Sequence, residues 1–494
     1  MKRNFFSSGT SVLLITVLVL FVFQNYSFAQ DKTSKIDKLM QVYYDLGKFN
    51  GTVLVAEKGK VLYKKGFGLA NMEWNIPNKP DMKFRIGSIT KQFTSMLILQ
   101  LVEQGKIDLE AKLNDYLPDY RKDTGEKVTI HHLLTHTSGI PSYTGLPEFS
   151  EKISRNPYSV DEFVKKYCSG DLEFEPGSKF VYNNSGYFLL GAIIEKVTKK
   201  KYEDVLKEKI FDPVGMKNTG YDHHSTVLEE RAAGYSKTFD GYNNAEYLDM
   251  SLPYAAGSLY SSVEDLYLWD QALYTEKLLS KKMKELLFKP HVSAMGQKYA
   301  YGWVVGKRSF PKSKEKVTSI AHGGGINGFN TQIVRLVDDK HLIVLFNNTG
   351  GANLAGMSSG IINILYDKPY QLPKKSIAEV IYQTIVEKDV ESAIKQYHDL
   401  KKEHFKDYDF RPTELNSLGY HLLQRVKKIK EAIEILKLNV KIYPKYANGY
   451  DSLAEAYMVN GDKLLAIKNY AKSLELDPNN TNAIEKLNKI NKEK

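Results

Sequence analysis

The chain has 494 residues, of which 42% are hydrophobic and 26% charged. This composition excludes collagen-like, disordered and wholly membrane-embedded proteins, and the length predicts two to four domains. The net charge of +11 is spread among acidic residues, which indicates a generally basic surface rather than a nucleic-acid groove, so we expect no nucleic-acid partner.

The N-terminal segment has the pattern of a secretory signal. Lys2 and Arg3 precede an apolar run over 12–23, and small residues stand at Ser27 and Ala29, the two positions that a signal peptidase reads. We predict a signal peptide over 1–29, a secreted or periplasmic location in the cell envelope, and no stable membrane span after cleavage. An uncleaved anchor is the alternative, although this apolar run is too short to cross roughly 30 Å of hydrocarbon.

The region 30–368 mixes strand and helix signals. The runs 51–57 and 61–67 flank Lys58-Gly59 and predict a hairpin, and a mostly helical stretch follows, with a buried helix over 92–104 that ends at Gly105. Further strands are predicted over 301–306, 317–321, 330–337 and 342–346. This order predicts an α+β domain in which an antiparallel sheet is flanked by helices and accompanied by a helical lobe.

Residues 369–375 are predicted to be a linker, because the composition changes to helix formers and charged residues over 376–494. A period of 34 residues, the tetratricopeptide length, appears in the pairs Ala432 and Ala466, Ile433 and Ile467, Pro444 and Pro478, and Asn448 and Asn482. We predict an all-α domain of tetratricopeptide-like helical repeats, with an unrelated helical bundle as the alternative. Such arrays often bind a protein or peptide partner, but nothing in the sequence identifies one.

The first chemical candidate is Ser88, which stands three residues before Lys91 at the start of the predicted buried helix. Residues at this spacing share a helix face. A serine hydroxyl becomes a nucleophile when a neighbour takes its proton, and a lysine crowded by apolar packing and other cations can do so. The same spacing recurs in charged contexts, for example at Ser392 and Lys395, so chance is the alternative for the motif alone.

Two further candidates lie downstream. Near lysine charges, Tyr182 can be driven toward phenolate and act as a general base, while Asn184 can donate to a substrate carbonyl. His322 begins a His-Gly-Gly-Gly run between two predicted strands, where glycines let a substrate approach and a backbone N–H can join that of Ser88 in an oxyanion hole. An ordinary loop tyrosine and a flexible glycine turn are the alternatives.

His131, His132 and His136 suggest a metal site, since the last two are four residues apart. A zinc site usually needs a third protein ligand, and the sequence has no His-Glu-x-x-His pattern, so we expect structural hydrogen bonds beneath the active-site loop, with no metal and no cofactor. The single cysteine, Cys168, excludes an intramolecular disulfide and a cysteine-based metal cluster. The tryptophans Trp269 and Trp303 are predicted to line the core and the cleft.

In their order and context, these motifs resemble the serine β-lactamase and penicillin-binding-protein superfamily. The most similar group within it contains class C β-lactamases, D-alanyl carboxypeptidases, D-aminopeptidases and related esterases. The resemblance covers nearly all of 31–368 and includes the stretches 84–93, 132–140 and 174–177. It implies an exported serine hydrolase that cleaves an ester or amide, with D-amino-acid peptides and β-lactams among the small-molecule or peptide substrates.

The resemblance also implies a role for each candidate residue. Ser88 would form an acyl-enzyme, with Lys91 and Tyr182 managing the proton. The groups that would bind the substrate are Asn184, His322 and Gly324, and the backbone N–H groups that would hold the oxyanion are those of Ser88 and Gly325. Where His322 stands, class C β-lactamases and many of the peptidases have the lysine of a Lys-Thr-Gly triplet, so a fixed cationic grip on a substrate carboxylate is weakened. The alternative function is a low-turnover or inactive protein that binds peptide or peptidoglycan fragments and scaffolds partners through its repeats.

Overall fold

The computed structural model describes residues 31–294, 296–310 and 315–492, so the predicted signal peptide over 1–29 lies outside the described residues. The chain divides into two compact units. The first runs to Lys237 and resumes over Tyr242–Leu372, and the second combines Thr238–Gly241 with Pro373–Lys494. Within the described ranges, no helix is both long enough and apolar enough to cross a membrane.

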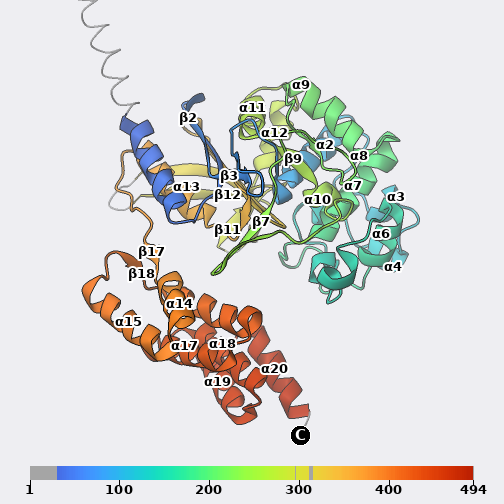
Figure 1. Cartoon of the computed structure of the whole chain (residues 1–494). Coiled ribbons are helices and arrows are strands. Elements are labelled where there is room, and N and C mark those ends of the chain that lie inside the picture. The colour runs from blue at the N-terminus through green and yellow to red at the C-terminus, as the bar shows by residue number, and fades with distance from the viewer. Residues whose placement is uncertain (1–30, 295, 311–314, 493–494) are drawn as a thin grey trace, which may run out of the picture. The chain divides into compact units, whose positions relative to one another are not determined.

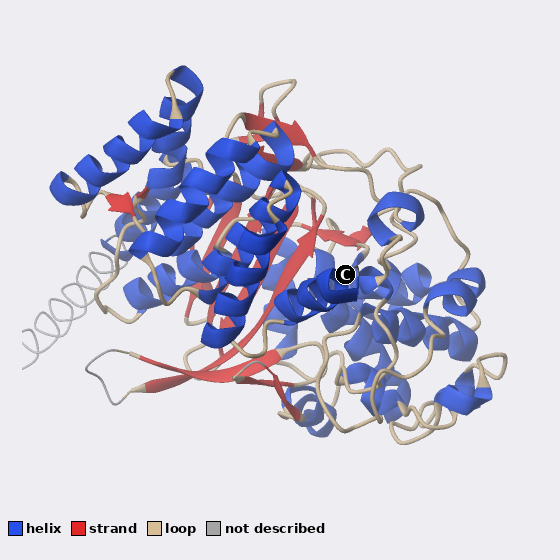
Figure 2. Cartoon of the chain, turned by 90° about the horizontal axis from the view of Figure 1, so that it is seen from below, coloured by secondary structure: helices blue, strands red, loops and turns tan. Residues whose placement is uncertain are grey.

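The first unit is built on an eight-stranded antiparallel sheet, whose long strands are red in Figure 2. Its strands, in spatial order, are β10 (Val292–Ala294), β11 (Gln297–Tyr299), β12 (Val304–Ser309), β13 (Lys316–Ile326), β14 (Phe329–Leu336), β15 (His341–Asn347), β1 (Gly51–Glu57) and β2 (Lys60–Phe67). Side chains alternate between the faces of a strand, so Leu54 and Ala56 enter one hydrophobic cluster while Val53 and Val55 enter another. Both faces of β1 are therefore buried, which explains its uninterrupted apolar run.

Helices cover both faces of this sheet. The helix over 31–45 and α13 (Leu354–Leu365) contribute to one cluster, while α2 (Thr90–Glu103) and α11 (Val263–Leu273) contribute to the other. The shorter helices form a lobe beside the sheet (Figure 1). The remaining helical segments of this unit are η1 (Gly87–Ile89), α3 (Leu113–Tyr116), α4 (Lys122–Gly125), α5 (Ile130–Leu134), η2 (Tyr143–Gly145), η3 (Phe149–Ile153), α6 (Val160–Tyr167), α7 (Asn184–Thr198), α8 (Tyr202–Leu206), η4 (Lys207–Phe211), α9 (Asp212–Val214), α10 (Tyr254–Gly257) and α12 (Lys281–Phe288).

Short strands complete the unit. They form the sheets β5 (Phe84–Arg85), β9 (Leu259–Ser261) and β6 (Gly220–Tyr221); β3 (Leu69–Asn71) and β4 (Ile76–Pro77); and β16 (Thr349–Gly350), β7 (Tyr235–Thr238) and β8 (Gly241–Asn244). The pairing of β5 with β9 matters for function, because β5 leads into η1 and α2 while β9 directly follows α10. The start of α2 and the end of α10, which are distant in sequence, are thereby held side by side.

The predicted α+β class with an antiparallel sheet is confirmed. The hairpin around Lys58-Gly59 is also confirmed, as is the buried helix, which ends at Gly105 in the left-handed conformation. Two predicted strands have wrong bounds. The strand predicted over 301–306 is β12, which begins later, and the strand predicted over 317–321 is β13, which continues to Ile326. Gly302 has a φ of +77°, so the chain turns there and β12 begins only at Val304.

The glycine run after His322 is not a segment between strands, as the sequence suggested. It lies inside the 11-residue strand β13, because Gly323–Ile326 continues the antiparallel pairing with β14 and the turn comes only at Asn327-Gly328. Glycines in a strand mark a close approach of another backbone rather than a turn, and such an approach is found here.

The second unit is helical, with its own hydrophobic core. Its elements are β17 (Lys375–Ser376), α14 (Ile377–Glu387), α15 (Val390–Glu403), β18 (Tyr408–Asp409), α16 (Pro412–Tyr420), η5 (His421–Val426), α17 (Ile429–Ile442), α18 (Ala447–Asn460), α19 (Lys463–Leu476) and α20 (Thr481–Lys492). The 34-residue spacing relates α17 to α19 and α18 to α20, and Ala432 and Ala466 are both fully buried.

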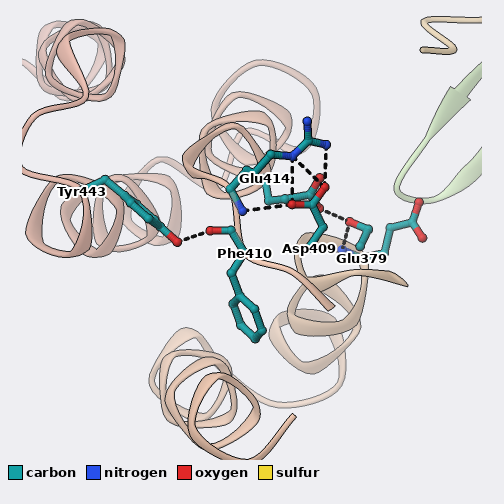
Figure 3. A network of polar contacts seen from close by, with 7 residues as sticks. Glu379, Asp409, Phe410, Glu414 and Tyr443 are labelled. Carbon is teal, nitrogen blue, oxygen red and sulfur yellow. Dashed lines mark hydrogen bonds and ion pairs between the residues drawn. The ribbon is translucent and has the colours of Figure 1, made fainter. Parts of the chain in front are cut away.

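Polar contacts fix the start of this unit (Figure 3). Asp409, at the end of β18, accepts hydrogen bonds of 2.9 Å from Nε of Arg411, and the Tyr443 hydroxyl donates to the carbonyl of Phe410. Ser376 accepts the N–H of Glu379 at 3.2 Å, which caps α14. The Tyr443 bond holds the loop before α16 against the end of α17, and the Ser376 hydroxyl also bonds Glu414, which joins the start of α14 to α16.

Candidate active site

Ser88 lies in the turn η1, which leads directly into α2. Gly87 has a φ of +51°, and a Cβ added there would lie 3.0 Å from the backbone nitrogen of Gly325. A glycine is therefore needed for the turn both to bend and to pack on β13. The Ser88 side chain is half-buried at the start of the helix, beside this strand.

The amine of Lys91 is fully buried and has three partners. Its Nζ lies 3.0 Å from Oγ of Ser88, 2.9 Å from Oδ1 of Asn184 and 2.9 Å from the carbonyl oxygen of Ala256. The predicted proximity of Lys91 to Ser88 is thus confirmed. Burial lowers the pKa of Lys91 well below its usual value, because a buried ammonium loses its hydration.

This set of partners indicates where the lone pair of the neutral amine points. The carbonyl of Ala256 and the Oδ1 of Asn184 can only accept, so they take the two N–H groups of the amine. The lone pair is then left for the hydroxyl of Ser88, which can donate. A buried neutral lysine in this arrangement can receive the serine proton.

Asn183 places the residues on either side of it. As the N-cap of α7, it accepts the N–H of Gly186 at 2.7 Å, and its Nδ2 donates to the carbonyl of Ile140 at 2.5 Å. An asparagine is a favoured N-cap because its side chain satisfies a free N–H of the first turn. Tyr182 and Asn184 are consequently held at the start of a buried helix, facing Lys91.

The ring centroid of Tyr182 lies 4.9 Å from Nζ of Lys91, and its hydroxyl bonds to Ser88. The expectation of a phenolate is wrong. Burial raises the pKa of Tyr182, and the bond to Ser88 only partly offsets it. The buried amine beside it does not act as a fixed cation, since its own pKa is lowered, so the tyrosine is a neutral hydroxyl and Lys91 is the member of the pair that can accept a proton.

The strand β13 presents an open edge next to Ser88. β12 pairs with β13 only as far as Ala321, and Gly323 and Gly325 are exposed. A two-residue turn makes Ile326 and Phe329 a hydrogen-bonded pair, so the next pair, Gly325 with Asn330, is not hydrogen-bonded. The N–H of Gly325 therefore points away from β14, toward the edge where Gly87 packs.

Gly324 marks the closest approach between β13 and the strand that leads to Ser88. An added Cβ would lie 1.9 Å from the carbonyl oxygen of Ile86 and 2.3 Å from Oγ1 of Thr331. The same oxygen accepts a hydrogen bond of 2.8 Å from Thr331. The carbonyl oxygen of Ile86 and the Thr331 hydroxyl bonded to it cannot make room for a Cβ unless the turn that carries Ser88 also moves.

We expect Gly324→Ala to lower the free energy of unfolding by roughly 1–3 kcal/mol, as overpacking does. The measurement is thermal or denaturant unfolding of the purified variant. Gly323→Ala is the matched control, because a Cβ at Gly323 meets nothing nearer than 3.6 Å and should leave stability almost unchanged. Equal stability of the two variants would contradict the close packing of Gly324 on Ile86.

Both ring nitrogens of His322 are engaged. Nδ1 lies 2.6 Å from the carbonyl of Gly323, and Nε2 lies 3.2 Å from the hydroxyl of Tyr299. Burial is the main cause that lowers the pKa of His322 to about 4. The imidazole is therefore neutral at neutral pH, which extends the sequence argument that this position has no fixed cation for a substrate carboxylate.

The three histidines considered for a metal site have other partners. His136 accepts the N–H of Asn183 at Nδ1 and bonds Tyr299 at Nε2, His132 accepts the N–H of Thr129, and His131 bonds Tyr301. The predicted structural hydrogen bonds are confirmed. The two tryptophans, Trp269 and Trp303, are both fully buried in the core.

Sequence reasoning missed the carbonyl of Ala256 and the hydroxyl of Tyr299. The carbonyl follows Tyr254, whose φ of +39° is rare for an aromatic residue and fixes the path of α10 toward Lys91. A backbone carbonyl carries no residue-type signal, and Tyr299 stands alone in the sequence.

Comparisons with known proteins agree with this geometry. The family model described as Beta-lactamase matches residues 36–358. The chain is 34% identical to a penicillin-binding protein of Bacillus subtilis (strain 168), over 72% of this chain and 83% of that one. It is 28% identical to the teichoic acid D-alanine hydrolase of Staphylococcus aureus, over 70% and 81% of the two chains. The crystal structure of D-amino acid amidase from Ochrobactrum anthropi SV3, complexed with D-phenylalanine, is similar with a TM-score of 0.58 and 25% identity, over 68% of this chain and 98% of that one.

Proposed function

The chain belongs to the beta-lactamase family and is a serine hydrolase, and we propose that it is exported and cleaves D-amino-acid esters and amides through an acyl-enzyme on Ser88. The observation that carries the proposal is the 3.0 Å contact between Oγ of Ser88 and the buried amine of Lys91. An alcohol next to a buried neutral amine is an activated nucleophile.

In the first half of the proposed reaction, the amine of Lys91 takes the proton of Ser88 while Oγ bonds to the substrate carbonyl carbon. The N–H groups of Ser88 and Gly325 receive the developing oxyanion. The tetrahedral intermediate then breaks its bond to the leaving oxygen or nitrogen. Tyr182 gives that atom a proton and regains one from the Lys91 ammonium.

In the second half, water attacks the acyl carbon. One proton of the water passes to Lys91 and Tyr182, which return a proton to Oγ of Ser88 as the bond to the acyl carbon breaks. Ser88 is thereby restored as the alcohol, and the free acid departs. Asn184 keeps Lys91 in place through Oδ1, while its Nδ2 donates to Oγ1 of Thr144 at 3.1 Å. We propose that His322 and Gly324 border the substrate on the opposite side.

The charge at His322 supports the proposed substrate class. His322 is neutral and has no free N–H to offer, so a leaving group with a free carboxylate gains no ion pair from it. A leaving group without a carboxylate, such as the polyol of an ester or the ammonia of an amide, needs no such ion pair. The names of two relatives, a teichoic acid D-alanine hydrolase and a D-amino acid amidase, support a D-amino acid as the acyl group.

The domain organisation is also part of the proposal. We propose a signal peptide over 1–29, a hydrolase domain over 30–368, a linker over 369–375, and tetratricopeptide-like repeats over 376–494 that serve as an accessory for a protein or peptide partner. The 34-residue relation between two consecutive helix pairs supports the repeats.

The test is hydrolysis by residues 30–494 and by Ser88→Ala across one panel. It contains D-alanine methyl ester, D-amino-acid amides, short-chain nitrophenyl esters, a D-Ala-D-Ala peptide and a chromogenic cephalosporin, with L-alanine methyl ester as the matched stereochemical control. We expect Ser88-dependent turnover that favours the D-alanine ester over both its L form and D-Ala-D-Ala. Preference for D-Ala-D-Ala would contradict the substrate class, and binding of peptide without turnover would favour a binding protein.

Tyr182→Phe is expected to lower kcat for the best substrate by about two orders of magnitude, because the hydroxyl that protonates the leaving group is lost. Steady-state kinetics measure this effect. Tyr202→Phe is the control: its buried hydroxyl bonds Thr94 at 2.6 Å, and its loss should leave kcat within about threefold. A loss below tenfold in Tyr182→Phe would assign the whole proton transfer to Lys91.

A further inference from the structure

An unbroken row of hydrogen bonds joins the two sides of the candidate site. The N–H of Asn183 donates to Nδ1 of His136 at 3.1 Å, and Nε2 of His136 lies 3.1 Å from the Tyr299 hydroxyl. That hydroxyl lies 3.2 Å from Nε2 of His322, whose Nδ1 lies 2.6 Å from the carbonyl of Gly323. Both ends of the row are backbone atoms.

The two ends fix the direction of every bond in the row. A backbone N–H can only donate, so Nδ1 of His136 accepts and Nε2 carries the proton that it donates to Tyr299. A carbonyl can only accept, so Nδ1 of His322 carries the proton and Nε2 accepts from Tyr299. One proton arrangement, with both imidazoles neutral, satisfies all four bonds.

The surroundings favour this neutral arrangement. The ionisable groups nearest the two imidazoles are Lys91 on α2, Tyr182 and Tyr187 at α7, Tyr299, and the imidazoles themselves. Burial is the largest cause that lowers the pKa of both imidazoles. Burial raises the pKa of Tyr299. The Tyr187 hydroxyl donates to the carbonyl of Leu134 at 3.0 Å and also lies beside the Tyr299 hydroxyl, where it can only accept.

We propose that His136 and Tyr299 are positioning residues whose hydrogen bonds form a strut between the segment at Asn183 and strand β13, holding His322 as the neutral Nδ1–H tautomer. The strut begins between Tyr182 and Asn184 and ends one residue before Gly324. It therefore sets the distance between the segment that carries Tyr182 and Asn184 and the strand that carries the N–H of Gly325. A lengthened strut would misplace them, and small misplacements are costly to catalysis.

The kinetic consequences rest on the proposed function, whereas the tautomers can be measured without it. The first measurement is the 15N–1H NMR spectrum of the histidine side chains in wild-type residues 30–494 at pH 7, with His322→Asn and His136→Asn to assign the signals. We expect His136 with its proton on Nε2 and His322 with its proton on Nδ1. A proton on Nε2 of His322, or a charged imidazole, would overturn the strut.

The second measurement compares Tyr299→Phe with Tyr301→Phe. Tyr301 is the matched control, because it is two residues away, is equally buried, and also bonds a histidine, His131 at 2.7 Å. We expect Tyr299→Phe to lower kcat/KM for D-alanine methyl ester by about tenfold to a hundredfold. The pH profile of the His322 side-chain 15N signals should move to higher pH, because the hydrogen bond that favours neutral His322 is lost. Tyr301→Phe should change neither.

The outcomes separate the two proposals. Ser88-dependent turnover with identical kinetics and pH profiles in the two tyrosine variants would overturn the strut and leave the proposed function standing. Absence of Ser88-dependent turnover would overturn the proposed function, and the NMR tautomers would still decide the strut.

Discussion

Ser88→Ala is expected to lower kcat/KM for a D-alanine ester by about four to six orders of magnitude, the effect seen when a serine nucleophile is removed from a hydrolase. The oxygen that bonds to the acyl group is deleted, and an alanine methyl cannot replace it. The measurement is steady-state hydrolysis, together with the mass of the protein quenched during turnover. The acyl adduct should appear in the wild type and be absent from the variant.

The fold should not change, because the Ser88 side chain is half-buried and gives up only its contacts with Lys91 and Tyr182. Circular dichroism and the unfolding temperature test this expectation. Ser392→Ala is the control, since Ser392 and Lys395 share the Ser-x-x-Lys spacing on α15, in the second unit. It should retain full activity. Retention of more than a hundredth of the rate by Ser88→Ala would assign the nucleophile elsewhere.

Local signals in the sequence predicted much of the framework. The hairpin at Lys58-Gly59 follows from two β-rich runs on either side of a short turn that contains a glycine, and the helix that ends at Gly105 follows from an apolar run before a glycine. The contact of Lys91 with Ser88 follows from helical spacing. In contrast, Asn184 reaches Lys91 from 93 residues away, and only the resemblance to a known family placed them together.

Protonation was harder to predict than placement. The sequence puts Tyr182 near a lysine, which suggested a phenolate, but burial acts on both groups and reverses the assignment by lowering the pKa of Lys91 and raising that of Tyr182. The depth of burial depends on α10 and α7, whose packing no local pattern specifies. The glycines of β13 were misplaced for a related reason, because their close contact with Ile86 exists only in the folded chain.

The second large effect is expected for Lys91→Arg, which should lower kcat by about three to four orders of magnitude. A guanidinium keeps its proton at any working pH, so it has no lone pair to offer Ser88, and its planar shape does not fit the two acceptors that hold the amine. Steady-state kinetics of the purified variant measure the loss. Lys83→Arg is the matched control, because Lys83 is also buried and donates to a backbone carbonyl, that of Glu229 at 3.1 Å, but has no role in the proposed reaction.

The pH dependence of the wild type gives an independent check on the same residue. Protonated Lys91 cannot accept the serine proton, so activity should be lost as pH falls through the pKa of this group and be retained above it. Because burial lowers that pKa well below 10.5, the acid limb of kcat/KM should lie far to the acid side of an ordinary lysine. A limb near 10, or a Lys91→Arg variant that keeps a tenth of the rate, would remove Lys91 as the base and leave Tyr182 as the candidate among the residues that the structure describes.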